Sequence, residues 1–153
     1  MAQAPPIVPA VLTCAIIDDD EINRLTLEHY VKITNSLQLT ASLSGSVEGL
    51  NFFSTGRQVD VLFLDVEMPE LNGLDMLRLL PEPPQVVLTT AHEDFGWEAF
   101  ELRVTDYLVK PFDYARFQQA LRKVRERCLQ PADTSTEVLL PFAPNAIVSD
   151  VKL

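Results

Sequence analysis

Carboxylates directly follow two apolar stretches of the sequence. Asp18 and Asp19 come after the apolar run 10–17, and Asp65 comes after the run 59–64. A continuous apolar run is typical of a strand that is buried on both faces of a parallel sheet. Because the carboxyl ends of such strands meet at one edge of the sheet, where α/β proteins place their chemistry, we expect these three acids to lie together.

Two further polar groups stand at the ends of later apolar runs. Thr90 and its neighbour Thr89 end one run, and Lys110 ends another, directly before Pro111. Three carboxylates that lie close together repel one another unless a cation is present, and Mg²⁺ binds such oxygen ligands while it keeps open positions for water. A carboxylate nucleophile beside a metal ion, an ammonium group and a hydroxyl is equipped to accept a phosphoryl group.

The positions of these groups depend on strands and helices that alternate five times. The strand-like runs are 10–17, 37–43, 59–64, 86–90 and 105–109, and each is followed by apolar residues at helical spacing. This alternation predicts an α/β fold: a flavodoxin-like, doubly wound (βα)5 parallel sheet with helices on both faces and strand order 2-1-3-4-5. The run 37–43 alternates apolar and polar residues, so we expect it at an edge of the sheet.

Local signals predict where the helices begin and end. Ser46 is expected to be the N-cap of the second helix and Asp113 that of the fifth, because their side-chain oxygens can accept hydrogen bonds from free backbone N–H groups. The third helix should end before Pro81, since proline cannot continue a helix. The fourth helix is expected from about 93 to 102.

The length and composition of the chain indicate one folded domain. Its 153 residues are 47% hydrophobic, which is enough for one substantial core. Residues 1–10 contain three prolines and no Lys or Arg, so we expect a disordered lead-in. Residues 11–129 should fold, and residues 130–153, which lose the strand and helix periodicity, should be a linker or a truncated segment.

The charge and the apolar pattern argue against several classes of partner. The net charge is −10, with 12 basic and 22 acidic residues, which argues against nucleic-acid binding by this segment itself. The apolar runs are too short to cross a bilayer, and the N-terminus lacks the pattern of a signal peptide, so we expect a cytoplasmic chain without membrane contact. In that compartment Cys14 and Cys128 should be free thiols.

The motifs at the four strand ends resemble those of the receiver domain of bacterial two-component response regulators. They are IIDDD at 16–20, LDVEMPELNG at 64–73, TA at 90–91 and DYLVKPF at 106–112. Each motif is short, but all four occur in the right order at the right strand ends, and the resemblance covers about residues 11–129. The stretch from 89 to 108 is further similar to receivers joined to LytTR-type (LytR/AlgR-type) DNA-binding domains.

The resemblance implies that Asp65 is the phosphoacceptor and that a histidine kinase is its phosphodonor. Asp18, Asp19 and Asp65, together with the backbone carbonyl of Glu67, would bind the cofactor Mg²⁺. The side chain of Glu67 places an additional carboxylate beside the phosphoryl site, which could alter the metal affinity or the lifetime of the phosphoryl group.

The resemblance also implies roles for residues of the fourth and fifth strands. Thr90 and Lys110 would contact the phosphoryl oxygens, and the peptide bond before Pro111 would be cis, which turns the lysine towards the site. Thr90 and Tyr107 would form a switch in which the aromatic ring turns inward after phosphorylation.

The output implied by the resemblance lies on the face made by the fourth helix, the fifth strand and the fifth helix. Side chains of both charges suit a two-fold contact, so this face could hold a homodimer. These charged residues are Glu93, Asp94, Arg103, Asp106, Arg122 and Lys123. The function implied is a signalling switch that controls transcription through a LytTR-type DNA-binding domain absent here.

The residue pattern leaves two assignments and one alternative function open. Asp20 competes with Asp18 and Asp19 for the metal, and Thr89 competes with Thr90 for the phosphoryl group. The alternative function is a Mg²⁺-dependent aspartyl-phosphate phosphatase of the haloacid dehalogenase type, which also uses strand-end Asp, Thr and Lys residues. The acidic triplet permits the Asp-x-Asp spacing of that class, but the residues that follow do not match it and the length leaves no room for its cap. We therefore expect a phosphoaccepting signalling domain rather than an enzyme.

Overall fold

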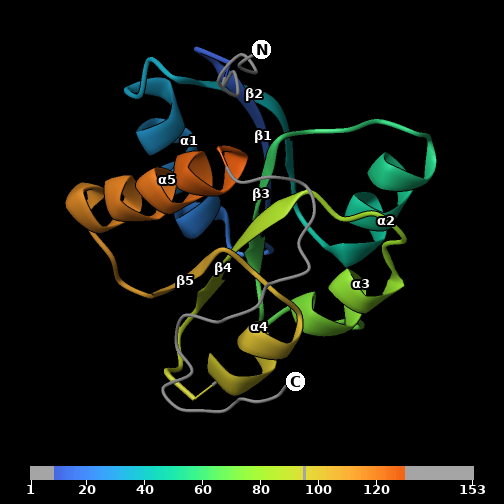
Figure 1. The fold of residues 1–153 in the computed structure, drawn as a ribbon. Coiled ribbons are helices and arrows are strands. Elements are labelled where there is room, and N and C mark those ends of the chain that lie inside the picture. Colours follow the sequence, from blue (N-terminus) through green and yellow to red (C-terminus); the bar gives the residue numbers. More distant parts are fainter. Residues whose placement is uncertain (1–8, 95, 130–153) are drawn as a thin grey trace, which may run out of the picture.

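The computed structural model describes residues 9–94 and 96–129, and within them strands and helices alternate as the sequence predicts (Figure 1). The strands are β1 (Leu12–Ile17), β2 (Leu37–Leu43), β3 (Val61–Asp65), β4 (Gln85–Thr90) and β5 (Asp106–Val109). The helices are α1 (Glu21–Lys32), α2 (Ser46–Ser54), α3 (Gly73–Leu79), α4 (Gly96–Glu101) and α5 (Tyr114–Cys128). Most of the expected lead-in 1–10 and all of the expected linker 130–153 lie outside the described residues.

The five strands form one parallel sheet in the order β2-β1-β3-β4-β5. This confirms the predicted flavodoxin-like order and the position of β2 at an edge. Helices α1 and α5 cover one face of the sheet, and α2, α3 and α4 cover the other (Figure 1). Because all five strands run in the same direction, their carboxyl ends lie together at one end of the sheet, which we call its carboxyl edge.

The central strand β3 shows why its sequence is continuously apolar. Leu62 and Leu64 pack into the core on the side of α2 and α3, whereas Val61 and Phe63 pack into the core on the side of α1 and α5. All four side chains are fully buried. A strand with both faces covered offers no position for a polar side chain until it reaches its carboxyl end, where Asp65 stands.

Of the two predicted N-caps, one is confirmed and the other is wrong. Asp113 caps α5 as predicted, because its side chain accepts a hydrogen bond from the backbone N–H of Arg116. The prediction of Ser46 as the N-cap of α2 is wrong by one residue, since the helix begins at Ser46 and Gly45 is the cap. The Ser46 side chain is buried, and its hydroxyl makes no hydrogen bond among the described residues.

Helix α4 is shorter than the predicted span 93–102, since it runs only from Gly96 to Glu101. The backbone N–H groups of Ala91 and His92 donate hydrogen bonds to side chains at the carboxyl edge of the sheet. The chain after β4 therefore follows that edge before it enters the helix, and the helix begins later than its sequence pattern suggests.

The two cysteines are free thiols, as expected. Cys14 is buried in β1, where burial raises its pKa to about 12, and Cys128 is half-buried at the end of α5. Among the helices of the described residues, none combines the length and the apolar composition that a membrane span requires.

Candidate functional site

The register of the sheet brings polar residues from distant parts of the sequence to one edge. Asp65 in β3 pairs with Thr89 in β4. Thr90 pairs with Val109 in β5, the residue before Lys110. The side chains at the ends of these strands therefore converge, as the sequence predicts.

Asp18, Asp19 and Asp65 form a cluster of carboxylates at this edge. One carboxylate oxygen from each residue lies within 4.8 Å of the others. Asp18 and Asp65 are buried and Asp19 is exposed, so the cluster opens to solvent on one side. The competing acid Asp20 caps α1 instead, because its side chain accepts hydrogen bonds from two backbone N–H groups of the first turn. Within the described residues, the geometry therefore favours the first two acids of the triplet.

Lys110 provides the cation that faces this cluster. Its Nζ atom lies 3.1 Å from Oδ1 of Asp65 and 3.2 Å from Oδ2 of Asp18. Burial by itself lowers the pKa of Lys110, but the two carboxylates outweigh this effect and raise that pKa above its usual value. The peptide bond between Lys110 and Pro111 is cis.

One ammonium group does not neutralise three carboxylates. Burial and the nearby charge of Asp18 raise the pKa of Asp65 from 3.8 to about 7, although Lys110 acts in the opposite direction. Converging oxygen ligands with excess negative charge suit a hard divalent cation such as Mg²⁺. The residues at this edge therefore fit the metal that the sequence predicts.

Thr90 and Glu67 form the second part of the site. The Thr90 hydroxyl donates a hydrogen bond of 2.6 Å to Oε2 of Glu67, and the backbone N–H of Ala91 donates one of 3.1 Å to Oε1. The competing Thr89 is fully buried and lies on the other side of β4, as strand alternation requires. Within the described part of the chain, its hydroxyl makes no hydrogen bond. Thr90 is thus the threonine that lines the site.

A tight turn after β3 positions Asp65 relative to Glu67. The backbone N–H of Glu67 donates a hydrogen bond of 3.3 Å to Oδ1 of Asp65. Gly73, at the end of the turn, lies so close to β3 that a Cβ atom there would be 2.2 Å from the carbonyl oxygen of Asp65. This close approach requires glycine, which accounts for the last residue of the motif at 64–73.

Arg24 is a residue beside the site that the sequence pattern did not indicate. Its Nη1 atom donates a hydrogen bond of 2.8 Å to the backbone carbonyl oxygen of Asp18. This contact ties the main chain of the acidic loop to α1. The one signal for it in the sequence is that Arg24 follows the Asp20 cap by about one helical turn.

The sequence of the chain matches the family model of the response regulator receiver domain over residues 14–122. The chain belongs to the response regulator receiver family. The matched range includes every residue of the site described above, so the family assignment and the geometry concern the same part of this receiver.

Relatives of this receiver include transcription regulators. It is 36% identical over 113 residues to the transcriptional regulatory protein BtsR of Escherichia coli (strain K12), a match that covers 72% of this chain and 47% of that protein. It is 34% identical over 119 residues to the sensory transduction protein LytT of Bacillus subtilis (strain 168), which covers 76% of this chain and 49% of that protein. The chain thus spans about half the length of these relatives.

A solved structure shares the fold of the receiver. The response regulatory domain of protein mrkE from Klebsiella pneumoniae has a TM-score of 0.68 and 25% sequence identity to it. The match covers 76% of this chain and 97% of that chain. This structure and the relatives agree with the similarity to receiver domains that the motifs at the strand ends indicate.

The haloacid dehalogenase alternative finds no support in the comparisons or in the geometry. Its Asp-x-Asp pair would consist of Asp18 and Asp20, but Asp20 caps α1 and is not part of the carboxylate cluster. The matched family is one of signalling domains.

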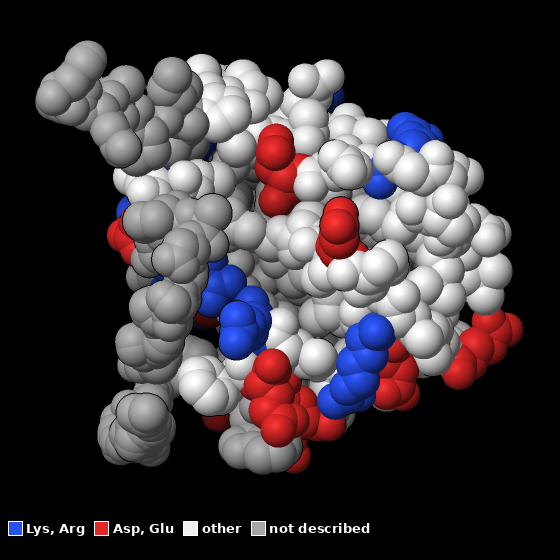
Figure 2. Space-filling view, turned by 45° about the vertical axis from the view of Figure 1, so that its right-hand side comes forward, with Lys and Arg blue, Asp and Glu red and all other residues white. Residues whose placement is uncertain are grey.

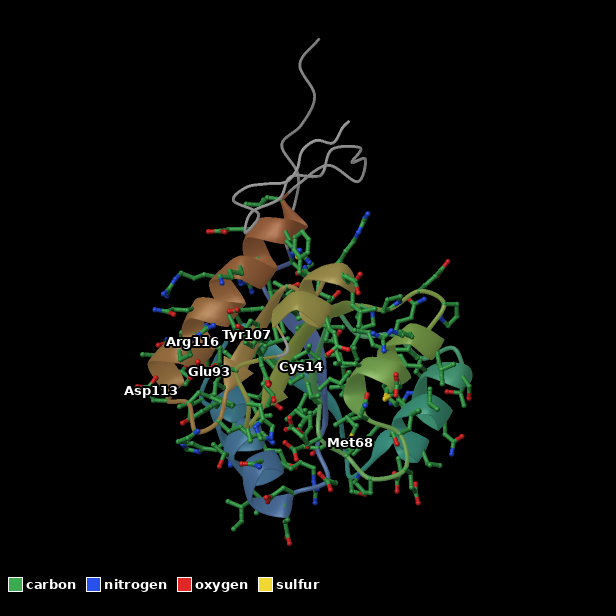
Figure 3. The ribbon with its side chains drawn as sticks, turned by 90° about the horizontal axis from the view of Figure 1, so that it is seen from below. Cys14, Met68, Glu93, Tyr107, Asp113 and Arg116 are labelled. Atoms are coloured by element: carbon green, nitrogen blue, oxygen red, sulfur yellow. The ribbon has the colours of Figure 1, made fainter. Side chains whose placement is uncertain are left out.

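The face formed by α4, β5 and α5 carries the expected switch residue. Tyr107 is half-buried on β5 and packs against the core on the side of α2, α3 and α4. The guanidinium of Arg116 donates a hydrogen bond of 3.1 Å to the carbonyl oxygen of Tyr107, and the two residues lie side by side in Figure 3. A hollow of about 590 Å³ on this face is lined by residues of all three elements, including these two.

Asp106, at the start of β5, is held by cations of α5. Arg116 binds both of its carboxylate oxygens, at 2.8 and 3.0 Å, and Nζ of Lys123 lies 3.3 Å away. Burial by itself raises the pKa of Asp106, but the hydrogen bonds and charge of Arg116, with Lys123, outweigh it and lower that pKa below its usual value. Asp106 and Lys123, two of the charged residues expected on this face, thus also contact each other within the chain.

The other charges expected on the α4–β5–α5 face are exposed. They are Glu93, Asp94, Arg103 and Arg122. On the side of the molecule shown in Figure 2, basic side chains lie beside acidic ones and do not form a continuous basic surface.

Proposed function

We propose that this receiver accepts a phosphoryl group on Asp65 from the phosphohistidine of a histidine kinase. The observation that carries the proposal is the position of the buried Asp65 carboxylate. It lies beside the acids of the β1 end and 3.1 Å from the ammonium group of Lys110, at an edge that also holds the Thr90 hydroxyl. A nucleophile, a cation and a hydrogen-bond donor thus surround the place where a phosphoryl group would be bound.

Mg²⁺ is the proposed cofactor of this reaction. Its ligands would be the carboxylates of Asp18, Asp19 and Asp65 and the backbone carbonyl oxygen of Glu67. When bound, the ion supplies positive charge that offsets the repulsion between the carboxylates and the incoming phosphoryl oxygens. The raised pKa of Asp65 supports this assignment, because burial and the charge of Asp18 disfavour the ionised carboxylate more than Lys110 favours it.

The proposed transfer starts from the ionised Asp65 carboxylate, the form that a bound cation would favour. An oxygen of the ionised Asp65 carboxylate forms a bond to phosphorus while the P–N bond to the kinase histidine breaks. The electron pair of that bond stays on the imidazole nitrogen. The ammonium group of Lys110 would then bind one phosphoryl oxygen, and the Thr90 hydroxyl would bind another.

The proposed output lies on the α4–β5–α5 face. Thr90 and Tyr107 stand on the adjacent strands β4 and β5. A hydroxyl drawn towards the phosphoryl group leaves space into which the aromatic ring can turn, and we infer that the changed face forms a homodimer. The names of the relatives favour control of transcription through a LytTR-type DNA-binding domain, and hence the cytoplasm as the place of action.

Incubation with acetyl phosphate and Mg²⁺ tests the proposed function. The chain should gain one phosphoryl group, detected as an increase in intact mass that hydroxylamine or acid removes. Asp65→Asn should gain none, whereas Asp94→Asn, a change at an exposed acid in the loop after β4, should react as the wild type does. Labelling of Asp65→Asn at the wild-type rate would show that another residue is the acceptor.

A further inference from the structure

The carboxylate of Glu67 engages two hydrogen-bond donors at the end of β4. Oε2 accepts from the Thr90 hydroxyl at 2.6 Å, and Oε1 accepts from the backbone N–H of Ala91 at 3.1 Å. Consecutive residues thus bind both oxygens of one anion, with one charge-assisted hydrogen bond to each. Thr90 is fully buried, so this contact is part of the built site and not a chance surface interaction.

We propose that Glu67 is an internal anion that fills the phosphoryl-binding subsite in the resting receiver and must leave it when Asp65 is phosphorylated. The inference rests on the proposed function, because it takes Asp65 as the phosphoacceptor. Glu67 follows Asp65 by two residues, and its backbone N–H already binds Oδ1 of Asp65. A phosphoryl group on Asp65 carries about −1.5 to −2 charges at pH 7, so its oxygens and the Glu67 carboxylate would repel each other and compete for the same donors.

The side chain of Glu67 can leave this subsite without unfolding it. Glu67 is only half-buried and Ala91 is exposed, so the carboxylate has a short path to solvent. Rotation about the side-chain bonds leaves the backbone carbonyl of Glu67, a proposed metal ligand, where it is. The departure removes two hydrogen bonds, and a phosphoryl group on Asp65 would restore them with its own oxygens.

The departure of Glu67 also links the site to the segment that leads into α4. The Thr90 hydroxyl donates a hydrogen bond to Glu67, and its oxygen accepts one of 3.0 Å from the backbone N–H of His92. A hydroxyl that turns from Glu67 to a phosphoryl oxygen therefore changes the surroundings of residues 90–92. Glu67 thus has two effects: it opposes the entry of an anionic phosphodonor, and it holds Thr90 in its resting position.

Substitution of Glu67 tests this proposal through the rate of phosphorylation. Glu67→Ala removes the anion and both acceptor oxygens, whereas Glu67→Gln keeps the shape and one acceptor but removes the charge. At saturating Mg²⁺, Glu67→Ala should react with acetyl phosphate roughly tenfold faster than the wild type and bind beryllofluoride, a phosphoryl mimic, roughly tenfold more tightly. The phosphorylation rate and the beryllofluoride affinity of Glu67→Gln should lie between those of the wild type and those of Glu67→Ala. Glu82→Ala, which removes an exposed carboxylate from the loop between α3 and β4, is the matched control and should change neither quantity.

A second measurement needs no phosphoryl group. Hydrogen exchange at the Ala91 amide of the resting receiver should be roughly tenfold faster in Glu67→Ala, because the amide loses its acceptor. Unchanged exchange at Ala91, or phosphorylation of Glu67→Ala that is no faster than that of the wild type, would overturn the inference while the proposed function stands. A wild-type chain that takes up neither phosphate nor beryllofluoride would refute the proposed function and the inference together.

Discussion

The substitution Asp65→Asn should stabilise the receiver in the absence of metal at neutral and alkaline pH. The wild-type carboxylate is buried beside Asp18, and Lys110, 3.1 Å away, offsets only part of the repulsion. An Asn side chain keeps an oxygen that can accept the hydrogen bond from Lys110 but carries no charge. Lys110 also keeps the Asp18 carboxylate as its ion-pair partner in the variant.

The size of the effect follows from the pKa of Asp65. Its rise from 3.8 to about 7 disfavours the ionised form in the folded chain by about 4 kcal/mol, since one pKa unit corresponds to about 1.36 kcal/mol. Water and side-chain movement around the site relieve part of this energy, so we expect a stabilisation of about 2 kcal/mol above pH 7.

The folding stability that depends on Asp65 should change with pH in the opposite direction to that of an ordinary ion-paired acid. Below the pKa of the unfolded chain, Asp65 is protonated in both states and its charge has no effect on stability. Between pH 3.8 and about pH 7, the folded wild type binds more protons than the unfolded chain, so its stability falls as the pH rises. The advantage of Asp65→Asn should therefore grow across this window and then remain constant.

Urea unfolding in the presence of a chelator, at several values between about pH 5 and about pH 8, measures this difference. Asp94→Asn is the control, and its stability should stay within about 0.5 kcal/mol of the wild type at every pH. Mg²⁺ added at the highest pH should stabilise the wild type more than Asp65→Asn. If Asp65→Asn is no more stable than the wild type above pH 7, or if its advantage does not change with pH, burial and the charge of Asp18 do not destabilise the ionised Asp65 carboxylate as described here.

Two further predictions concern the turn after β3 and the output face. Gly73→Ala should cost more than about 2 kcal/mol in urea unfolding, because the new Cβ would meet a backbone oxygen at 2.2 Å. Gly45→Ala, where the Cβ would meet only the flexible end of Glu48, should cost less than about 1 kcal/mol, and equal losses would contradict the steric reason. In sedimentation, beryllofluoride should increase self-association of the chain, and Arg122→Glu should weaken it; a monomer in both states would exclude dimerisation of this segment as the output.

The amino-acid sequence by itself determined the fold and the strand ends that build the site. A continuous apolar run identifies a strand covered on both faces, and the residue that ends such a run must lie at the edge of the sheet. Asp18 and Asp65 were predictable on this basis, because each directly follows such a run, whereas Lys110 follows the shorter strand-like run 105–109, which includes Asp106. Local side-chain chemistry also sufficed for the Asp113 cap, which acts within one helical turn.

Only the tertiary structure decided between neighbouring residues of the same type. Thr89 and Thr90 are equivalent in the sequence pattern, but alternate residues of a strand point to opposite faces, so a change of register by one residue would exchange them. The sequence pattern alone allows Asp20 to take the place of Asp19 at the metal site. In the folded chain, the Asp20 carboxylate caps the start of α1 instead.

The partners of two charged side chains were likewise decided by folding. Glu67 contacts Thr90 across 23 residues of sequence, and Lys123 lies 3.3 Å from Asp106, a contact that the sequence pattern did not indicate. These contacts depend on where β3, β4, β5 and α5 place their side chains after packing. Local spacing specifies the type of each element and its apolar face, but not which polar groups of different elements meet, because that depends on the register and packing of the whole sheet.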